Sequence, residues 1–435
     1  MPLEQWTEDP SVSVGDIAVM LDGTSHVTLE GIIVAHAKDT GISAERVSDV
    51  LISNCTVFGH GANGVTIDDA LRSGVVDSHI YDVGCIGVTL SGGNITTLEP
   101  GLNFALRNRI HHMANFKRTY QPGLHWSGVN NTMSHNYISD GPHNCILGGG
   151  NEGPGVNNLF EYNTLDKCSY ESSDTGAFYT CGQMANAFVN RGNELRHGLF
   201  KNIRNTEGSG VQGITIQAVY LDDQVRAATM QCIRSFPFVG FRSCLPIRER
   251  LNLKSSIERF TASQMSGWHI WNNTFYNCMT GTFIGGGEYN RFHDNYYQEC
   301  DTAHHFDNRG MNWQGGAANC TATPCIAGDQ PKGTGNKCSC NPAAVTTLLD
   351  GPAGAEWKAT WPEMEDVFHP PCLVSGKGAV PCKNEVVDNS YCKSAKFIDA
   401  TQASTDSWDS TVKNNAEIKC KYDKEPPAFG NPRLQ

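Results

Sequence analysis

Short runs in which every second residue is apolar recur along most of the chain. This alternation is the pattern of β-strands with one buried and one exposed side. The runs predict strands at residues 64–68, 87–91, 123–127, 144–148, 177–181, 218–222 and 303–307. We expect five apolar members to point inward: Val65, Val88, Leu124, Phe178 and Val219. The residues between them then form an outward column of Thr66, Thr89, His125, Tyr179, Tyr220 and His305.

A second recurring unit places an asparagine between apolar residues. Its members are Asn54, Asn108, Asn136, Asn163, Asn193, Asn273 and Asn295, with Ser78 as a weaker member. Apart from one interruption, successive members are 22 to 30 residues apart, which suits a coil of three short strands and three turns. Stacked amide side chains can bond to one another and to the neighbouring backbone. The predicted fold is all-β, a right-handed parallel β-helix.

The repeat is interrupted between Asn193 and Asn273. Residues 225–264 are rich in arginine and lack the asparagine and glycine periodicity. Removing them joins residues 220–224 to residues 265–270 as a strand, a turn and a strand. Two interpretations stay open. The segment is either an intron retained in reading frame or a genuine lid over the outward face.

Composition and charge narrow the function. The chain has 435 residues and a formal net charge of −12, and it contains no long basic run. A nucleic-acid partner is therefore not expected, because binding to phosphates needs a positive stripe. The acidic balance also does not favour polyanionic substrates. No apolar stretch is long enough for a membrane span. We expect a monomer that acts on a polysaccharide or oligosaccharide.

The cysteines are concentrated near the C-terminus. Eight of the 17 lie in the last 116 residues: Cys320, Cys325, Cys338, Cys340, Cys372, Cys382, Cys392 and Cys420. They suggest disulfides made in an oxidising compartment, and a metal site is less favoured because no paired CxxC unit occurs. We expect a β-helix over residues 1–315 and a cysteine-rich cap over residues 316–435. Residues 1–6 do not resemble a signal peptide, so we expect a secreted protein whose natural N-terminus lies upstream.

Carboxylates gather near two of the predicted strands. Glycoside hydrolysis needs one carboxylic acid and one carboxylate on the same substrate face. Asp222 ends an alternating strand on its outward side, and Asp174 lies in the turn before the strand of the preceding coil. We predict that these two residues are the catalytic pair, with Glu171 and Asp223 as the nearest substitutes. The alternative is that Asp174 only forms a turn.

Seven short motifs, in order, resemble glycoside hydrolase family 141 and related β-helix proteins. They lie at residues 124–126, 142–144, 149–151, 170–179, 220–223, 283–287 and 307–310, and the resemblance covers roughly residues 25–315. It implies hydrolysis of a plant or algal polysaccharide, with fucosidase-like or xylanase-like activity. Together with the outward column it suggests seven substrate-binding residues: His125, His143, Tyr179, Tyr220, His305, Asp307 and Arg309.

Two other functions stay open. A polysaccharide lyase or uronan epimerase uses a similar face, but it needs a base and a cation for the uronate, and Arg309 is the only cation near the predicted column. A non-catalytic carbohydrate-binding solenoid is the third possibility. No cofactor is expected. The Asp222–Asp223 pair suggests at most a structural Ca²⁺ ion.

Overall fold

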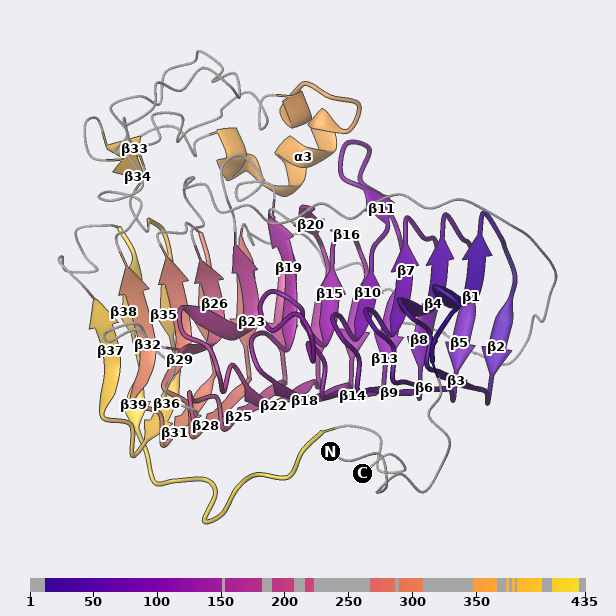
Figure 1. Ribbon diagram of the computed structural model, residues 1–435. Helices are drawn as coiled ribbons and strands as arrows, with labels where there is room; N and C mark the ends of the chain where they lie inside the picture. Colours follow the sequence, from indigo (N-terminus) through magenta and orange to yellow (C-terminus); the bar gives the residue numbers. More distant parts are fainter. Residues whose placement is uncertain are drawn as a thin grey trace, which may run out of the picture.

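The computed structural model describes residues 12–150, 153–181, 190–206, 216–222, 267–285, 289–307, 347–365, 373–374, 378–379, 382–400 and 409–429. Three parallel sheets of 11 strands each run along the molecule (Figure 1). Each coil contributes one strand to sheet A, one to sheet B and one to sheet C, in that chain order. Sheet A consists of β1 (Ile17–Asp22), β4 (Thr40–Glu45), β7 (Val65–Asp68), β10 (Val88–Leu90), β15 (Leu124–Trp126), β19 (Ile146–Gly150), β23 (Thr175–Cys181), β26 (Ile216–Asp222), β29 (Thr280–Gly285), β32 (Thr302–Asp307) and β37 (Lys396–Ala400).

The other two sheets complete each coil. Sheet B consists of β2 (Thr28–Glu30), β5 (Leu51–Ser53), β8 (Gly74–Val76), β13 (Phe104–Leu106), β17 (Thr132–Ser134), β21 (Leu159–Glu161), β24 (Asn193–Arg196), β27 (Trp268–Trp271), β30 (Arg291–His293), β35 (Glu385–Val387) and β38 (Thr411–Lys413). Sheet C consists of β3 (Ile33–Ala35), β6 (Thr56–Phe58), β9 (His79–Tyr81), β14 (Arg109–His111), β18 (Tyr137–Gly141), β22 (Thr164–Cys168), β25 (Leu199–Lys201), β28 (Thr274–Tyr276), β31 (Tyr296–Gln298), β36 (Ser390–Cys392) and β39 (Ala416–Glu417). The predicted parallel β-helix is confirmed.

The corner between sheets B and C is uniform. Each B strand is separated from the next C strand by two residues, from 31–32 in the first coil to 414–415 in the last. The first of the two always has a positive φ, as in Asn54 (51°) and His135 (58°), which turns the chain sharply. The second points inward, as Asn136 does with an exposed fraction of zero.

Asparagines form a ladder at that second position. Its members are Asn108, Asn136, Asn163, Asn273, Asn295, Asn389 and Asn415, and each backbone N–H that meets the next side chain donates to its Oδ1, as from Asn108 to Asn136 at 3.0 Å. Two predicted members lie elsewhere. Asn54 occupies the left-handed position, with Cys55 inward. Asn193 belongs to a second ladder at the corner between sheets A and B, where Asn158 N–H donates to its Oδ1 at 2.9 Å.

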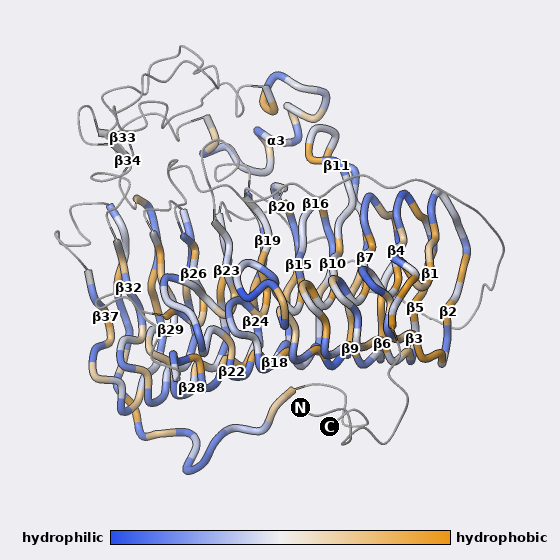
Figure 2. The backbone as a smooth tube through the Cα atoms, in the orientation of Figure 1, coloured by the Kyte–Doolittle hydropathy of each residue, from blue (hydrophilic) through white to orange (hydrophobic). Residues whose placement is uncertain are grey.

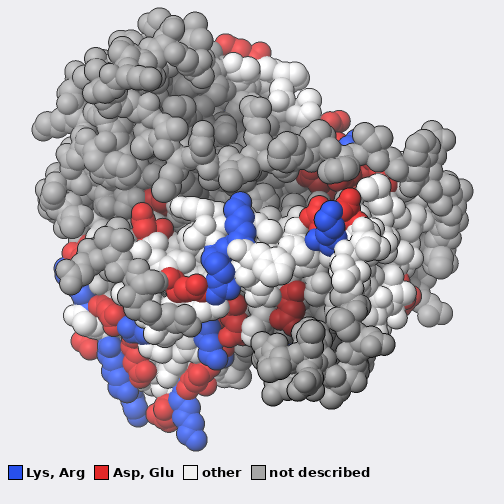
Figure 3. All heavy atoms as spheres, in the orientation of Figure 1, with Lys and Arg blue, Asp and Glu red and all other residues white. Residues whose placement is uncertain are grey.

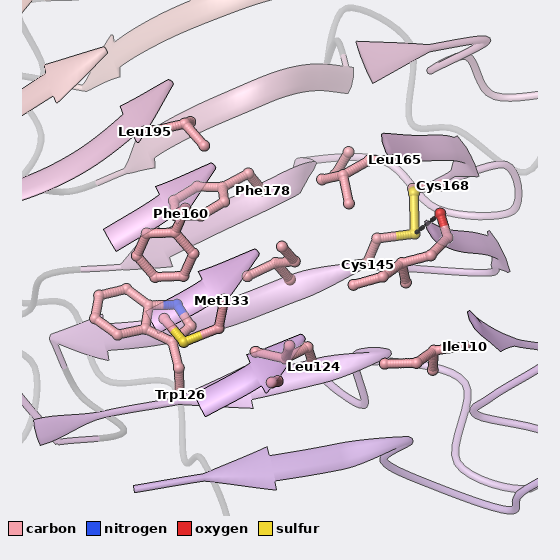
Figure 4. Close-up of a cluster of buried hydrophobic side chains, with 14 of the residues drawn as sticks. Ile110, Leu124, Trp126, Met133, Cys145, Phe160, Leu165, Cys168, Phe178 and Leu195 are labelled. Carbon is pink, nitrogen blue, oxygen red and sulfur yellow. Dashed lines mark hydrogen bonds between the residues drawn. A yellow bond between two sulfur atoms is a disulfide. The ribbon is translucent and has the colours of Figure 1, made fainter. Parts of the chain in front are cut away.

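The apolar side chains fill the interior of the coil. All five residues predicted to point inward are fully buried, so the predicted register is confirmed. Aromatic rings stack along the axis, with Trp126, Phe160 and Phe178 in edge contact at centroid distances of 4.8 and 5.0 Å (Figure 4). A disulfide joins Cys145 to Cys168 inside this core. The tube in Figure 2 alternates between apolar and polar colours along each strand.

The corner between sheets A and B accepts long connections. It spans residues 46–50 between β4 and β5, but residues 308–384 between β32 and β35. Residues 225–264 also fall at this corner, between Asp222 at the end of β26 and Trp268 at the start of β27. The segment itself lies outside the described residues. Both flanking strands pair normally with their neighbours, so the interruption coincides with one connection between strands.

Short elements also lie at this corner. They are the hairpin of β11 (Gly93–Asn94) and β12 (Glu99–Pro100), the pair β16 (Gly128–Val129) and β20 (Gly155–Val156), helix α3 (Gly354–Thr360), the 3-10 turn η4 (Pro362–Glu365), and the pair β33 (Leu373–Val374) and β34 (Gly378–Ala379). Trp357 and Trp361, from the helical segment, pack against Val129 and Val156. The helix therefore covers a side of the solenoid and not its end (Figure 1).

The three sheets continue past residue 315. Strands β35 to β39 add the last two coils, so part of the region expected to be a cap is solenoid. Of the eight C-terminal cysteines, Cys392 is bonded to Cys420, and Cys382 is also in a disulfide. The other five lie outside the described residues.

After β39, residues 418–429 form a strap that runs back across the outward side of sheet C, the yellow segment below the solenoid in Figure 1. The Lys421 N–H donates to Tyr296 Oη at 2.8 Å, in β31. Farther along, the Phe429 N–H donates to Thr164 Oγ1 at 2.7 Å, in β22. The strap therefore reaches from the C-terminal coils to the middle of the solenoid.

Candidate functional site

One outward column runs the full length of sheet A. Strand register places these residues one above another: Met20, Ser43, Thr66, Thr89, His125, Leu147, Tyr179, Tyr220, Phe283, His305 and Asp399. All six residues that the alternation assigned to an outward column are in it. The column changes character along its length, because its early members are polar and Leu147 begins an apolar block.

The apolar block consists of Leu147, Tyr179, Tyr220 and Phe283, whose exposed fractions lie between 0 % and 4 %. The Tyr179 and Tyr220 rings lie 5.2 Å apart, and Tyr220 meets Phe283 at 4.7 Å. Their ring faces are therefore unavailable to a sugar in this structure, contrary to the substrate-binding role expected for the tyrosines.

The glycines beside this block do not form an open floor. A Cβ at Gly148 would lie 2.0 Å from the Trp126 carbonyl oxygen, so close backbone packing explains this glycine. The glycine-rich sequence therefore reports packing between coils at this position, and not a low surface for a sugar ring.

The two tyrosines hold the two predicted catalytic carboxylates in a crossed arrangement. Tyr179 Oη donates to Asp222 Oδ2 at 2.7 Å, from β23 to β26. Tyr220 Oη donates to Asp174 Oδ1 at 3.1 Å, from β26 back to the turn before β23. Asp222 is 5 % exposed, whereas Asp174 is exposed and has a left-handed φ of 53°. The structure therefore brings both carboxylates onto one pair of phenols.

His143 and Tyr120 lie beside the same pair. Their rings are 4.6 Å apart, and Tyr120 packs against the apolar block. His143 Nδ1 lies 2.5 Å from Asn144 Oδ1 and 3.2 Å from Thr175 Oγ1. Burial lowers the pKa of His143 to about 4, against the opposing effects of the Asn144 bond and the Asp174 charge. The imidazole is therefore neutral at pH 7.

Glu171 is already paired. Arg118 donates to both of its carboxylate oxygens, with Nε at 3.2 Å from Oε1, and also to the Tyr170 hydroxyl at 3.4 Å. The ion pair links the corner before β15 to the corner before β23. Glu171 is thus a less suitable catalytic substitute than the sequence suggested, because its charge is engaged by a guanidinium.

The remaining predicted residues are spread along sheet A. His125 is half-buried in β15. His305 stacks on Phe283 at 4.5 Å, and its Nδ1 lies 3.5 Å from Asp399 Oδ2. Asp307 ends β32 opposite Gly285. Asp223 and Arg309 lie outside the described residues, as does the side chain of Asp307.

Sequence reasoning missed three residues of this region. Tyr120 and Arg118 come from a corner with no periodic pattern, so no sequence signal placed them near the carboxylates. Asp399 could have been found, because residues 396–400 form a strand of sheet A that continues the outward column.

The described part of the chain shows no group of three or more His, Cys, Asp or Glu side chains placed to hold a metal ion. None of its helices has the length and apolar character that a membrane crossing requires. On the face drawn in Figure 3, basic side chains of the described residues lie among acidic ones and form no positive stripe.

Comparison with known proteins agrees with the architecture. Residues 17–219 match the family model of the right-handed β-helix region. No curated protein matches the chain, and no solved structure matches it. The same three sheets continue beyond the matched region to Glu417. The chain is therefore a right-handed parallel β-helix protein.

Proposed function

We propose that the protein hydrolyses glycosidic bonds in a plant or algal polysaccharide, with Asp174 and Asp222 as its two carboxylates. The observation that carries the proposal is the crossed arrangement in which Tyr179 and Tyr220 each bind the carboxylate from the other's coil. Fixed carboxylates on either side of one substrate position are what glycoside hydrolysis requires.

Burial suggests the role of each carboxylate. Loss of solvent penalises the charged form of a carboxyl group, so the buried Asp222 suits the acid that protonates the leaving oxygen. The exposed Asp174 suits the base that takes a proton from water. The water oxygen then attacks the anomeric carbon as the bond to the leaving oxygen breaks.

The positions of the two residues favour inversion of configuration. Asp174 precedes β23, and Asp222 pairs with Cys181 at the far end of that strand. The two carboxylates therefore approach the tyrosine pair from opposite directions. Room for a water molecule between carboxylates, at roughly 6.5–9.5 Å, is typical of inverting enzymes.

The strands of sheet A argue against a uronate substrate. Lys396 in the last strand is the only Lys or Arg in the eleven strands, and its Nζ is bound to Asp399 Oδ1 at 2.5 Å. A lyase or epimerase needs a positive group beside the uronate carboxylate. Hydrolysis of a neutral glycan is therefore the better-supported reaction.

The test is release of reducing sugar from xylan, fucosylated pectin and uronans, by the full chain and by a form lacking residues 225–264. We expect release from the neutral or fucosylated substrates, and loss of at least 100-fold in the Asp174→Asn and Asp222→Asn variants. Asp82→Asn is the matched control, because Asp82 is also exposed with a left-handed φ, at 51°. Absence of release from both forms would contradict hydrolysis and favour a binding solenoid.

A further inference from the structure

The early part of the outward face is polar and accessible, unlike the apolar block. We define the polar grid as Thr66, Asp68, Thr89, Ser91, His125 and Ser127, on and just after β7, β10 and β15. Asp68 is exposed, and the others are half-buried. Thr66, Thr89 and His125 lie directly above one another in the outward column.

Two hydroxyls of the grid have spare hydrogen-bonding capacity. Among the described residues, neither the Thr66 nor the Thr89 hydroxyl makes a hydrogen bond, although each can donate once and accept twice. Beside them, Ser91 Oγ donates to Asp68 Oδ1 and receives the Asp69 N–H at 3.2 Å. This second pair is pre-oriented by its own bonds. The grid therefore offers free hydroxyls next to a fixed polar edge.

The apolar block closes the other side of the candidate carboxylates. Leu147, Tyr179, Tyr220 and Phe283 are buried, so the outward column beyond β15 offers almost no ring surface to a ligand. A long substrate can then extend from Asp174 and Asp222 only toward the polar grid. Four strand-to-strand steps separate Thr66 from Tyr179, about 19 Å in all, which is room for a few sugar units.

The charge of this face selects among glycans. β7, β10 and β15 contain no Lys or Arg, and the exposed Asp68 carboxylate repels a uronate. Hydroxyl, imidazole and carboxylate groups instead match the many hydroxyls of a neutral sugar chain. A coil-to-coil spacing of about 4.8 Å also brings a new pair of polar groups at nearly each sugar unit.

We propose that the polar grid binds the chain of a neutral polysaccharide and presents its end to Asp174 and Asp222, so that sugar is removed from chain ends. This inference rests on the proposed hydrolytic function for its second half only. The binding of the neutral chain stands on the grid itself.

The first experiment measures binding by titration calorimetry to the full-length Asp222→Asn variant. The probes are xylohexaose, cellohexaose, the corresponding disaccharides and hexagalacturonate. We expect at least one neutral hexasaccharide to bind tenfold or more tightly than its disaccharide and than hexagalacturonate. Replacing Thr66 and Thr89 together by Val should remove most of that tenfold gain and leave disaccharide binding unchanged.

Thr28→Val is the matched control, because Thr28 is an exposed strand threonine on sheet B and should not alter binding. Valine preserves the shape and strand preference of threonine, so folding is retained. Equal binding of hexasaccharide and disaccharide, no binding of either neutral hexasaccharide, or an unchanged gain in the double variant would each overturn the inference.

The second experiment follows the products of the wild-type chain. Single units released from a chain end support the inference, and a mixture of internal fragments contradicts removal from chain ends. If the neutral hexasaccharide binds through Thr66 and Thr89 but no sugar is released, the hydrolytic function fails while the binding surface stands. If sugar is released without dependence on chain length, the inference fails and hydrolysis stands.

Discussion

At the scale of single residues, two phenols determine how the candidate carboxylates are held. Tyr179 and Tyr220 are buried, so their contribution comes from the hydroxyls and not from exposed ring faces. Each hydroxyl fixes a carboxylate of the neighbouring coil. They are therefore positioning residues for Asp174 and Asp222.

We predict that Tyr179→Phe and Tyr220→Phe each lower kcat at least tenfold, because a carboxylate that loses its donor samples other orientations. Stability should fall by only about 1 kcal/mol, the usual net value of one hydrogen bond. Steady-state kinetics and chemical unfolding measure the two effects. A fall in kcat that merely follows the loss of folded protein would show that the hydroxyls have a structural role alone.

A second prediction concerns His304, whose exposed fraction is zero and whose ring lies 4.8 Å from those of Phe292 and Phe306. Burial, with a smaller effect of His305, lowers its pKa to about 3 from an ordinary value of 6.5. The unfolded chain therefore binds a proton below pH 6.5 that the native chain excludes. The free energy of unfolding should be fully retained above pH 6.5 and fall as the pH drops toward 3.

The expected contribution of His304 between pH 7 and pH 4 is about 3 kcal/mol. The variant His304→Leu cannot titrate, so its free energy of unfolding should depend less steeply on pH over that interval. Chemical unfolding at a series of pH values measures the slope. His269, with a pKa lowered to about 3 by burial first, remains in the variant and gives the residual slope. Equal slopes in the two proteins would contradict the assignment.

At the scale of the structural element, the coil repeats a fixed corner and two variable ones. The B–C corner always uses a left-handed residue followed by an inward residue, and this rule gives the asparagine ladder. Asn136 shows why the ladder stabilises the coil. Its Nδ2 donates to the Ala105 carbonyl at 2.9 Å and to Asn163 Oδ1 at 3.0 Å, while its own Oδ1 receives the Asn108 N–H.

We predict that Asn136→Ala lowers the free energy of unfolding by about 2–4 kcal/mol, because several buried groups lose their partners at once. Asn54→Gly is the control at the preceding corner position, which is exposed and needs only a residue that tolerates its φ of 51°. It should change stability by less than about 1 kcal/mol. Chemical unfolding followed by circular dichroism compares the two. Similar losses in both variants would contradict the role assigned to the ladder.

The repeat explains what the sequence could and could not predict. Alternation has a period of two, so it fixed the inward residues of sheet A and the outward column. The two asparagine ladders have the same local signature, and the sequence therefore assigned Asn193 to the wrong corner. Gly198 occupies the B–C position of that coil, and its N–H donates to Asn273 Oδ1 at 2.8 Å.

The candidate site shows the same division. Asp222 lies on a strand, so its outward direction followed from alternation. The burial of Tyr179 and Tyr220, and the partners of Glu171, depend on contacts between different coils and on aperiodic corners. Such contacts have no sequence period, which is why Arg118 and Tyr120 were not predicted.

At the scale of the whole molecule, the strap is the feature that local pattern did not predict. Residues 418–429 contain no alternation of the kind found in the coils, and their partners lie far back in the chain. Lys201 shows the connection. Its Nζ lies 3.1 Å from Asp166 Oδ2 in the neighbouring coil and also bonds to Glu425 of the strap. The Cys392–Cys420 disulfide ties the start of the strap to the penultimate coil.

We predict that replacing Cys392 and Cys420 together by Ser lowers stability by about 3–4 kcal/mol, as expected for a closed loop of this length. The two cysteines are separated by 28 positions. Hydrogen exchange should also become fast at the Lys421 and Tyr422 amides, which are bonded to β31 in the native chain. Cys85→Ser, at a free and partly buried thiol, is the control. Unchanged exchange at the strap amides would contradict the proposed anchoring.

The strap also has a consequence for how the molecule unfolds. In a solenoid, each coil touches only the coils beside it, so the terminal coil can fray without disturbing those farther in. Here the strap joins β31 to β25 and β22, bypassing the coils between them. Loss of the last coil removes the anchor of these distant contacts. The C-terminal half should therefore open as one cooperative unit, whereas the N-terminal coils, which the strap does not reach, can open one at a time.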